Sequence, residues 1–283
     1  MAQAAIAADA LRAAADDEIT LVPLHTRGDE ISRRRPGAGW AASDGQFTSD
    51  LERRLVRGEI DAVVHSYKDL PTTTDPRLVV AAVLERGDPA DCLITGSGTG
   101  LPDLGFGARI GTSSARRAAQ LAALRPDLIA TPIRGNVESR IERVRNGVLD
   151  GVVLAVAGLD RLGIPVPPGA RLPLDTMLPA PAQGALAIQV RRDDATLLAA
   201  VGRADHEPTR RAVEAERDLL LAIGGGCLAP LGALGEVLGD ELRLRAAFEA
   251  SDGLLQRADE RGLDHRGVVD RVASVLLAAA VPA

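Results

Sequence analysis

Apolar segments alternate with polar turns along the chain at the spacing of strands and helices. The first third predicts helices over 1–15 and 49–57 and strands over 19–24, 60–64 and 78–84. Segment 60–64 is apolar and rich in β-branched residues, which predicts a buried parallel strand. The residues that follow are mostly polar up to Pro71, so we expect the strand to end before this proline.

The middle third repeats a strand, a turn and a short helix. The predicted units are 109–111 into 113–124, 128–133 into 136–146, and 151–156 into 158–162. This alternation predicts a parallel sheet. The charged segment 85–91 is interpreted as a hinge into this second domain, and the proline-rich segment 165–181 as an extended return connection. A strand over 185–191 then pairs back into the first sheet.

The pattern changes again from Glu207 onward. A helix over 209–222 and a glycine-rich loop over 224–230 precede strands over 234–237, 242–249 and 254–260 and a helix over 265–280. The predicted fold class is therefore α/β, with two hinged α/β lobes and a smaller α+β C-terminal domain. The predicted domains are 1–86 with 185–203, then 90–180, then 207–283.

Composition narrows the classes of function. Of the 283 residues, 46% are hydrophobic but only 2% aromatic, so the cores are built from Ala, Val, Leu and Ile. A net charge of −6 argues against a general attraction to nucleic acid or to an anionic membrane. The absence of a long apolar run or a signal peptide predicts a cytoplasmic protein, and a monomer is expected. Two cysteines without metal-ligand spacing predict neither a disulfide framework nor a metal site.

Polar residues gather where the strand 60–64 ends. Lys68 is the only lysine among 33 basic residues, and Asp69 follows it directly, with Ser66 nearby. Open α/β sheets bind their ligands at the carboxyl ends of strands, which makes this segment a candidate site. The alternative is an exposed ion pair in a turn, of little energetic importance.

Hydroxyl and guanidinium groups recur at the helix starts of the second domain. The residues concerned are Thr112, Ser113 and Ser114 with Arg116 and Arg117, then Arg134, Asn136 and Arg140, and finally Arg161. Free amide groups at helix amino termini bind anions, and arginines reinforce them. Three such clusters in successive turns predict a ligand with several carboxylates or phosphates, whereas a single arginine alone more often covers a solvated helix face.

A single thiol lies in the glycine-rich loop 224–230. The three glycines before Cys227 leave room for a bulky group at the sulfur, which suits nucleophilic chemistry or covalent attachment. The alternative is a buried structural cysteine, and Cys92, in an apolar run, fits that interpretation better. Gln183, next to Gly184, is a further candidate polar contact at the hinge.

Taken together, these motifs resemble the hydroxymethylbilane synthase (porphobilinogen deaminase) family. The resemblance is carried in unbroken order by residues 65–71, 111–117, 134–137, 154–159, 178–184 and 225–227. It implies three domains, the first two like type II periplasmic binding proteins. It also implies a dipyrromethane cofactor held by a thioether bond to Cys227, onto which four porphobilinogen molecules are added with loss of ammonia before water releases the linear tetrapyrrole.

The resemblance also implies roles for individual residues. Asp69 matches the catalytic aspartate, which handles the pyrrole NH groups and stabilises the positive charge formed on deamination. The carboxylates of the cofactor and substrate would be bound by Lys68, Ser66, Thr112, Ser113, Ser114, Arg116, Arg117, Asn136 and Gln183 and by Arg134, Arg140 and Arg161. Segment 26–46 would be a mobile lid over the cleft.

The sequence departs from the family pattern in two places. Family members begin with a strand that bears an arginine and a serine, and this chain starts after it. The lid of many members carries lysines, whereas this chain has Trp40 and Asp44, so Arg33, Arg34 or Arg35 would have to compensate. Two alternatives to the active enzyme therefore stay open: a truncated or inactive relative, and a non-catalytic two-lobed protein that binds polycarboxylates.

Overall fold

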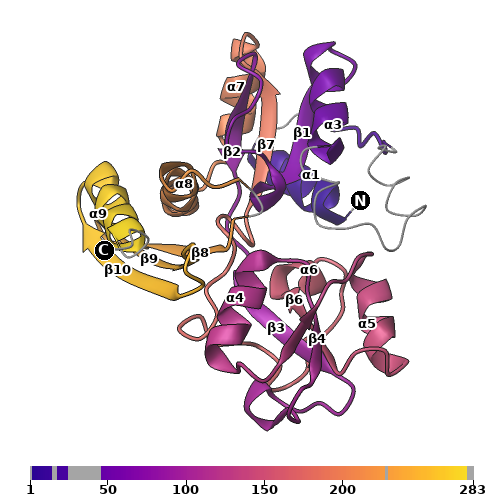
Figure 1. Cartoon of the computed structure of the whole chain (residues 1–283). Helices are drawn as coiled ribbons and strands as arrows, with labels where there is room; N and C mark the ends of the chain where they lie inside the picture. Colours follow the sequence, from indigo (N-terminus) through magenta and orange to yellow (C-terminus); the bar gives the residue numbers. More distant parts are fainter. Residues whose placement is uncertain (1, 15–17, 25–45, 227–228, 279–283) are drawn as a thin grey trace. The chain divides into compact units, whose positions relative to one another are not determined.

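The computed structural model describes residues 2–14, 18–24, 46–226 and 229–278 (Figure 1). The chain divides into two compact units, Met1–Gly87 with Gly184–Arg211 and Asp88–Gln183 with Ala212–Ala283. The predicted lid lies outside the described residues except for Gln46, which begins a helix. None of the helices described is long and apolar enough to cross a membrane.

A three-stranded sheet forms the centre of the first unit. Its order is β1 (Ala62–Ser66), β7 (Leu186–Arg191), β2 (Leu78–Val83). The return strand β7 is antiparallel to both neighbours, with Val63 opposite Gln189. The prediction that β1 pairs in parallel is therefore wrong. Its neighbour in the sheet is β7, which runs in the opposite direction. The predicted pairing of 185–191 into this sheet is confirmed.

Helices cover both faces of this sheet. One face packs on α1 (Ala2–Ala14) and α7 (Ala195–Gly202), and the other on α3 (Gln46–Val56). Along β1, Val64 belongs to the first core and Val63 to the second, as strand alternation requires. Two predictions are corrected here. Residues 19–24 form no strand, and α3 begins three residues before Ser49.

A mixed four-stranded sheet forms the centre of the second unit. Its order is β3 (Asp91–Thr95), β6 (Gly151–Ala155), β4 (Arg109–Gly111), β5 (Ile129–Thr131). The last three strands are parallel, as predicted, but β3 is antiparallel to β6. The sequence predicts a hinge over 85–91, whereas Asp91 is the first residue of β3. The proline-rich segment runs along the outer edge of β3, where Leu172 N donates to Asp91 O at 2.8 Å.

Two apolar layers enclose this sheet. The helix α4 (Ala115–Leu124) packs on the face that bears Leu93 and Ile110. The helices α5 (Val137–Arg145) and α6 (Val156–Asp160) pack on the face that bears Cys92 and Val152. Cys92 is fully buried, and burial raises the pKa of its thiol to about 12. Its interpretation as a structural cysteine is confirmed.

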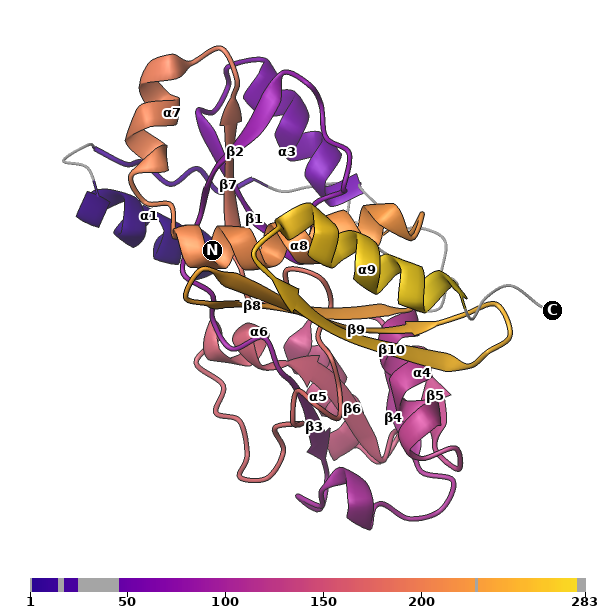
Figure 2. The same ribbon diagram turned by 90° about the vertical axis from the view of Figure 1, so that its left-hand side faces the viewer.

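The C-terminal region is an antiparallel sheet with helices. It contains α8 (Glu207–Ala222), β8 (Leu231–Leu238), β9 (Glu241–Glu249), β10 (Leu255–Gly262) and α9 (His265–Ala278). The strand β9 lies between the other two, and α9 covers one face of the sheet through Val268, Val272 and Leu276 (Figure 2). The opposite face packs Leu234 and Ala247 against Leu178, which brings this region into the second compact unit.

Candidate functional site

In the first unit, the end of β1 presents Asp69 to solvent. After Ser66 the chain makes a short 3-10 turn, Tyr67–Asp69, in which Tyr67 is buried and Lys68 is half-buried. The backbone NH of Tyr67 donates to Ala185 O at 3.1 Å, which ties the turn to the segment before β7. Since Tyr67 and Leu70 anchor the turn on both sides, the carboxylate of Asp69 is left exposed.

A polar chain that sequence reasoning missed starts at His65, just before this turn, and includes buried Gln189. His65 Nε2 is 3.0 Å from Gln189 Oε1, and Gln189 Nε2 donates to Glu52 Oε1 at 3.0 Å. The chain joins β1, β7 and α3. Burial lowers the pKa of His65 to about 4, and the hydrogen bond to Gln189 offsets this only in part. Strand alternation, which puts His65 on the same face as buried Val63, was the available signal.

In the second unit, the predicted hydroxyl residues build the turn into α4. Thr112 Oγ1 accepts from Ser114 N at 3.1 Å, and Ser114 Oγ caps the helix by accepting from Arg117 N at 3.4 Å. Ser113 Oγ donates to Ile133 O and accepts from Ile133 N at 3.0 Å. The three hydroxyl groups therefore shape the strand-to-helix turn that carries the two arginines.

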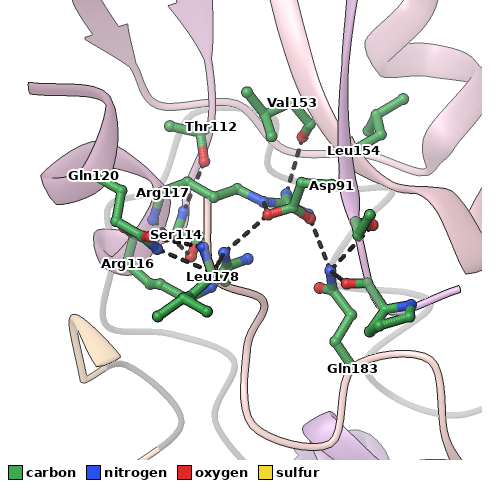
Figure 3. A network of polar contacts seen from close by, with 12 residues as sticks. Asp91, Thr112, Ser114, Arg116, Arg117, Gln120, Val153, Leu154, Leu178 and Gln183 are labelled. Atoms are coloured by element: carbon green, nitrogen blue, oxygen red, sulfur yellow. Dashed lines mark hydrogen bonds and ion pairs between the residues drawn. The ribbon is translucent and has the colours of Figure 1, made fainter. Parts of the chain in front are cut away.

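Both arginines at the start of α4 bind one buried carboxylate, that of Asp91 (Figure 3). Arg117 donates two hydrogen bonds to it, from Nη2 to Oδ1 at 2.7 Å and from Nε to Oδ2 at 3.2 Å. Arg116 contacts it with Nη1 alone, at 2.8 Å from Oδ2, and the same nitrogen donates to Leu178 O at 2.7 Å. Gln183 Nε2 completes the group, at 2.8 Å from Asp91 Oδ1.

This group, which we call the Asp91 network, is almost free of solvent contact. Exposed fractions are 0% for Asp91, 3% for Arg116 and 7% for Arg117. Burial by itself would raise the pKa of Asp91, but the two guanidinium groups outweigh burial and hold this pKa well below its usual range. Sequence reasoning missed Asp91 because an acidic residue in a charged, proline-containing segment looks like a surface residue.

The next helix start, that of α5, is also built as predicted. Asn136 caps it, and its side-chain oxygen accepts from Ser139 N at 2.9 Å. Gly135 has φ +112, and a Cβ there would lie 2.2 Å from Ser139 Oγ, so only glycine fits. Arg140 Nε donates to Gly135 O at 2.8 Å, and burial, with a contribution from Arg117, lowers the pKa of Arg140.

The remaining predicted arginines and the cysteine loop are placed less fully. Arg134 precedes the cap of α5 and Arg161 follows the end of α6, both half-buried. Cys227 lies outside the described residues. The loop before it begins with a helix stop, in which Gly224 has φ +70 and Gly225 N donates to Leu220 O at 3.0 Å. Gly226 O accepts from Ala229 N at 2.9 Å, so the two residues that flank 227–228 are hydrogen-bonded.

Several of the predicted residues form one group within each compact unit. The Asp91 network and its turn contain Thr112, Ser114, Arg116, Arg117 and Gln183. The other group, at the end of β1 in the first unit, contains Ser66, Lys68 and Asp69. Among the residues described, no three acidic, histidine or cysteine side chains form a group able to hold a metal ion. The ligand-binding roles of all these residues stay predictions.

The fold and these sites define a mixed α/β protein with arginine-rich strand-to-helix turns. Two family models match it: "Porphobilinogen deaminase, dipyromethane cofactor binding domain" over residues 1–199, and "Porphobilinogen deaminase, C-terminal domain" over residues 210–274. The chain belongs to the porphobilinogen deaminase family. The C-terminal model also agrees with the predicted additional domain at that end.

Curated relatives support the same assignment over nearly the whole chain. A porphobilinogen deaminase of Xanthomonas oryzae pv. oryzae is 45% identical over 273 residues, which covers 93% of this chain and 89% of the relative. One of Stenotrophomonas maltophilia is 45% identical, covering 92% and 86%. Among solved structures, the VFT2 domain of Bordetella pertussis BvgS is a distant likeness, with 15% identity, a TM-score of 0.41 and coverage of 72% and 76%.

Proposed function

We propose that this chain is a hydroxymethylbilane synthase. It would join four porphobilinogen molecules in turn, each losing ammonia as a new carbon–carbon bond forms, and water would release the linear tetrapyrrole. The family assignment supports this, and one structural observation carries it furthest. The Asp91 network holds two guanidinium groups against one carboxylate, which leaves a buried positive charge suited to an anionic ligand.

One donor group of the second unit, on Arg116, supports binding of a dipyrromethane, which bears several carboxylates. Arg116 Nε is buried and has no hydrogen-bond partner among the described residues. The residues that would hold the cofactor are Lys68, Ser66, Thr112, Ser113, Ser114, Arg116, Arg117, Asn136 and Gln183, with Cys227 as the point of covalent attachment. When bound, the dipyrromethane supplies a primer whose free pyrrole ring is the nucleophile.

Substrate recognition would fall to the second group of arginines. Porphobilinogen carries an acetate and a propionate, and a guanidinium group binds a carboxylate through two parallel hydrogen bonds. Arg134, Arg140 and Arg161 come from the two turns next to the Asp91 network along the chain. We assign them to the carboxylates of the incoming substrate.

Asp69 would act on the charge that develops during deamination. Loss of ammonia from porphobilinogen leaves a cation, and a carboxylate fixed in advance stabilises it without reorganising. The buried neighbours of Asp69 fix its turn, while its own side chain stays exposed and has no partner among the described residues. Lys68, next to it, would bind a ligand carboxylate.

The covalent adduct on the purified chain is the decisive measurement. The chain is expressed in cells that make porphobilinogen, and its intact mass is compared with that of Cys227→Ser. We expect a two-pyrrole adduct on the wild type and none on the variant. Cys92→Ser is the matched control and keeps the adduct, because Cys92 is a core residue with a neutral thiol. A bare wild-type chain that binds carboxylates reversibly would instead favour the non-catalytic alternative.

The same proposal includes a cytoplasmic monomer that acts without nucleic acid or membrane. The net charge of −6 supports the last two points, since polyanions and anionic lipids repel such a chain. Size-exclusion chromatography with light scattering measures the mass in solution. A mass near 29.5 kDa is the expected result, and twice that value would contradict it.

A further inference from the structure

The two arginines of the Asp91 network use different edges of their guanidinium groups. Arg117 turns its Nε and Nη2 edge, the edge suited to a carboxylate, toward Asp91 and gives Nη1 to Val153 O at 2.9 Å. Arg116 does the opposite. Its Nη1 alone serves both Asp91 and Leu178 O, while its Nε and Nη2 edge has no partner among the described residues.

The Nε of this edge is buried, and a buried donor without a hydrogen-bond partner is costly to maintain. Arg116 is 3% exposed, so water cannot compensate fully for the missing hydrogen bond of Nε. The orientation persists because Nη1 is held from two sides, by the carboxylate of Asp91 and by the carbonyl of Leu178. This arrangement leaves the two-nitrogen edge ready for a carboxylate that the protein itself does not supply.

We propose that Asp91 is the positioning residue of this site: by holding Arg116 through Nη1, it orients the Nε and Nη2 edge toward a ligand carboxylate. Its carboxylate also accepts hydrogen bonds from Nε and Nη2 of Arg117 and from Nε2 of Gln183, which lies in the segment that leads out of the second unit. Asp91 itself touches no ligand in this scheme. The inference rests on the proposed function, because the carboxylate concerned would belong to the dipyrromethane.

The test measures how fast the cofactor is assembled, which differs from the activity of the loaded enzyme. Full-length chain is made in cells that lack porphobilinogen, then incubated with porphobilinogen, and the gain of intact mass is followed over time. Asp91→Asn keeps the shape of the side chain, but its amide NH2 group is a donor and would face the donor groups of the two arginines and Gln183. We expect it to assemble the cofactor about tenfold more slowly or worse, at a temperature where its melting curve shows it folded.

The matched control is Asp88→Asn, three residues upstream. Asp88 binds Arg171 with the same two-nitrogen geometry, at 2.7 and 3.0 Å, but the pair is partly exposed and Arg171 is in no predicted ligand set. This variant should assemble the cofactor at the wild-type rate. Should folded Asp91→Asn also do so, Asp91 would have only a structural role and the inference would be overturned.

A second variant decides the matter if Asp91→Asn does not fold. Asp91→Glu keeps the charge but is longer by one methylene, which displaces Arg116. Assembly slowed by about threefold or more would support the positioning role, and wild-type assembly would overturn it. A wild-type chain that gains no mass would overturn the proposed function and this inference with it, whereas equal rates in wild type and variants overturn the inference alone.

Discussion

Asp69 and Asp91 are both acidic residues at the end of a strand, and the structure treats them in opposite ways. Asp69 closes the 3-10 turn after β1, is exposed, and has no side-chain partner in the described part of the chain. Asp91 begins β3, is 0% exposed and binds two guanidinium groups and an amide. A carboxylate whose hydrogen bonds are all made within the protein suits a structural role, whereas an exposed carboxylate without a partner is able to act on a substrate.

The largest expected effect is on stability at Asp91. Asp91→Ala leaves two buried guanidinium groups without their counter-ion and should lower the free energy of unfolding by about 3–5 kcal/mol. Asp69→Ala, on an exposed turn, should change it by no more than about 0.5 kcal/mol. Urea unfolding of both variants measures the difference. Similar losses in the two would show that the contrast in burial has no energetic meaning.

The reverse order is expected for turnover. Asp69→Ala should reduce the rate of tetrapyrrole formation about 10²–10³-fold, since it removes the charge that stabilises the developing cation. The adduct on Cys227 should remain in this variant. Asp193→Ala, an exposed carboxylate of the same unit, is the control and should retain the wild-type rate. Full turnover in Asp69→Ala would refute the assigned role.

A third test concerns the buried residue close to Asp69. Because the pKa of His65 is lowered from 6.5 to about 4, the unfolded chain binds this proton more readily than the folded one between those values. The contribution of His65 to the free energy of unfolding is therefore fully present above pH 6.5. It is lost as the pH drops toward 4, by about 3 kcal/mol in total. His65→Gln should remove that part of the dependence, and urea midpoints at pH 7 and pH 4.5 show it. Parallel curves for the two proteins would contradict the prediction.

The smallest effect refines the comparison within one segment. Asp88 and Asp91 both bind arginine, but the pair of Asp88 with Arg171 is partly exposed. Asp88→Asn should therefore lower the free energy of unfolding by no more than about 1 kcal/mol. A loss as large as that of Asp91→Ala would mean that geometry, and not burial, determines the energy of such pairs.

Local chemistry made several features predictable. A cap needs only its own side chain and the next few amides, so a helix start such as that at Asn136 is predictable from the sequence. The apolar run 185–191 was correctly assigned to the first sheet. The short helix α7 was missed, although Asp194 caps it in the same way, with Oδ1 accepting from Leu197 N at 3.0 Å. The segment of α7 is short, and the spacing of its apolar residues does not distinguish a buried helix face from an exposed one.

The sequence by itself determined the family, the order of the motifs and the residue types that suit a polycarboxylate ligand, because these depend on neighbours along the chain. Only the tertiary structure decided that β7 lies between β1 and β2 and that Asp91 is buried. It also decided which edge Arg116 keeps for a partner. Such facts depend on residues far apart in the chain. Arg116, for example, lies 25 positions from Asp91 and 62 from Leu178, and a local pattern carries no record of where those residues meet.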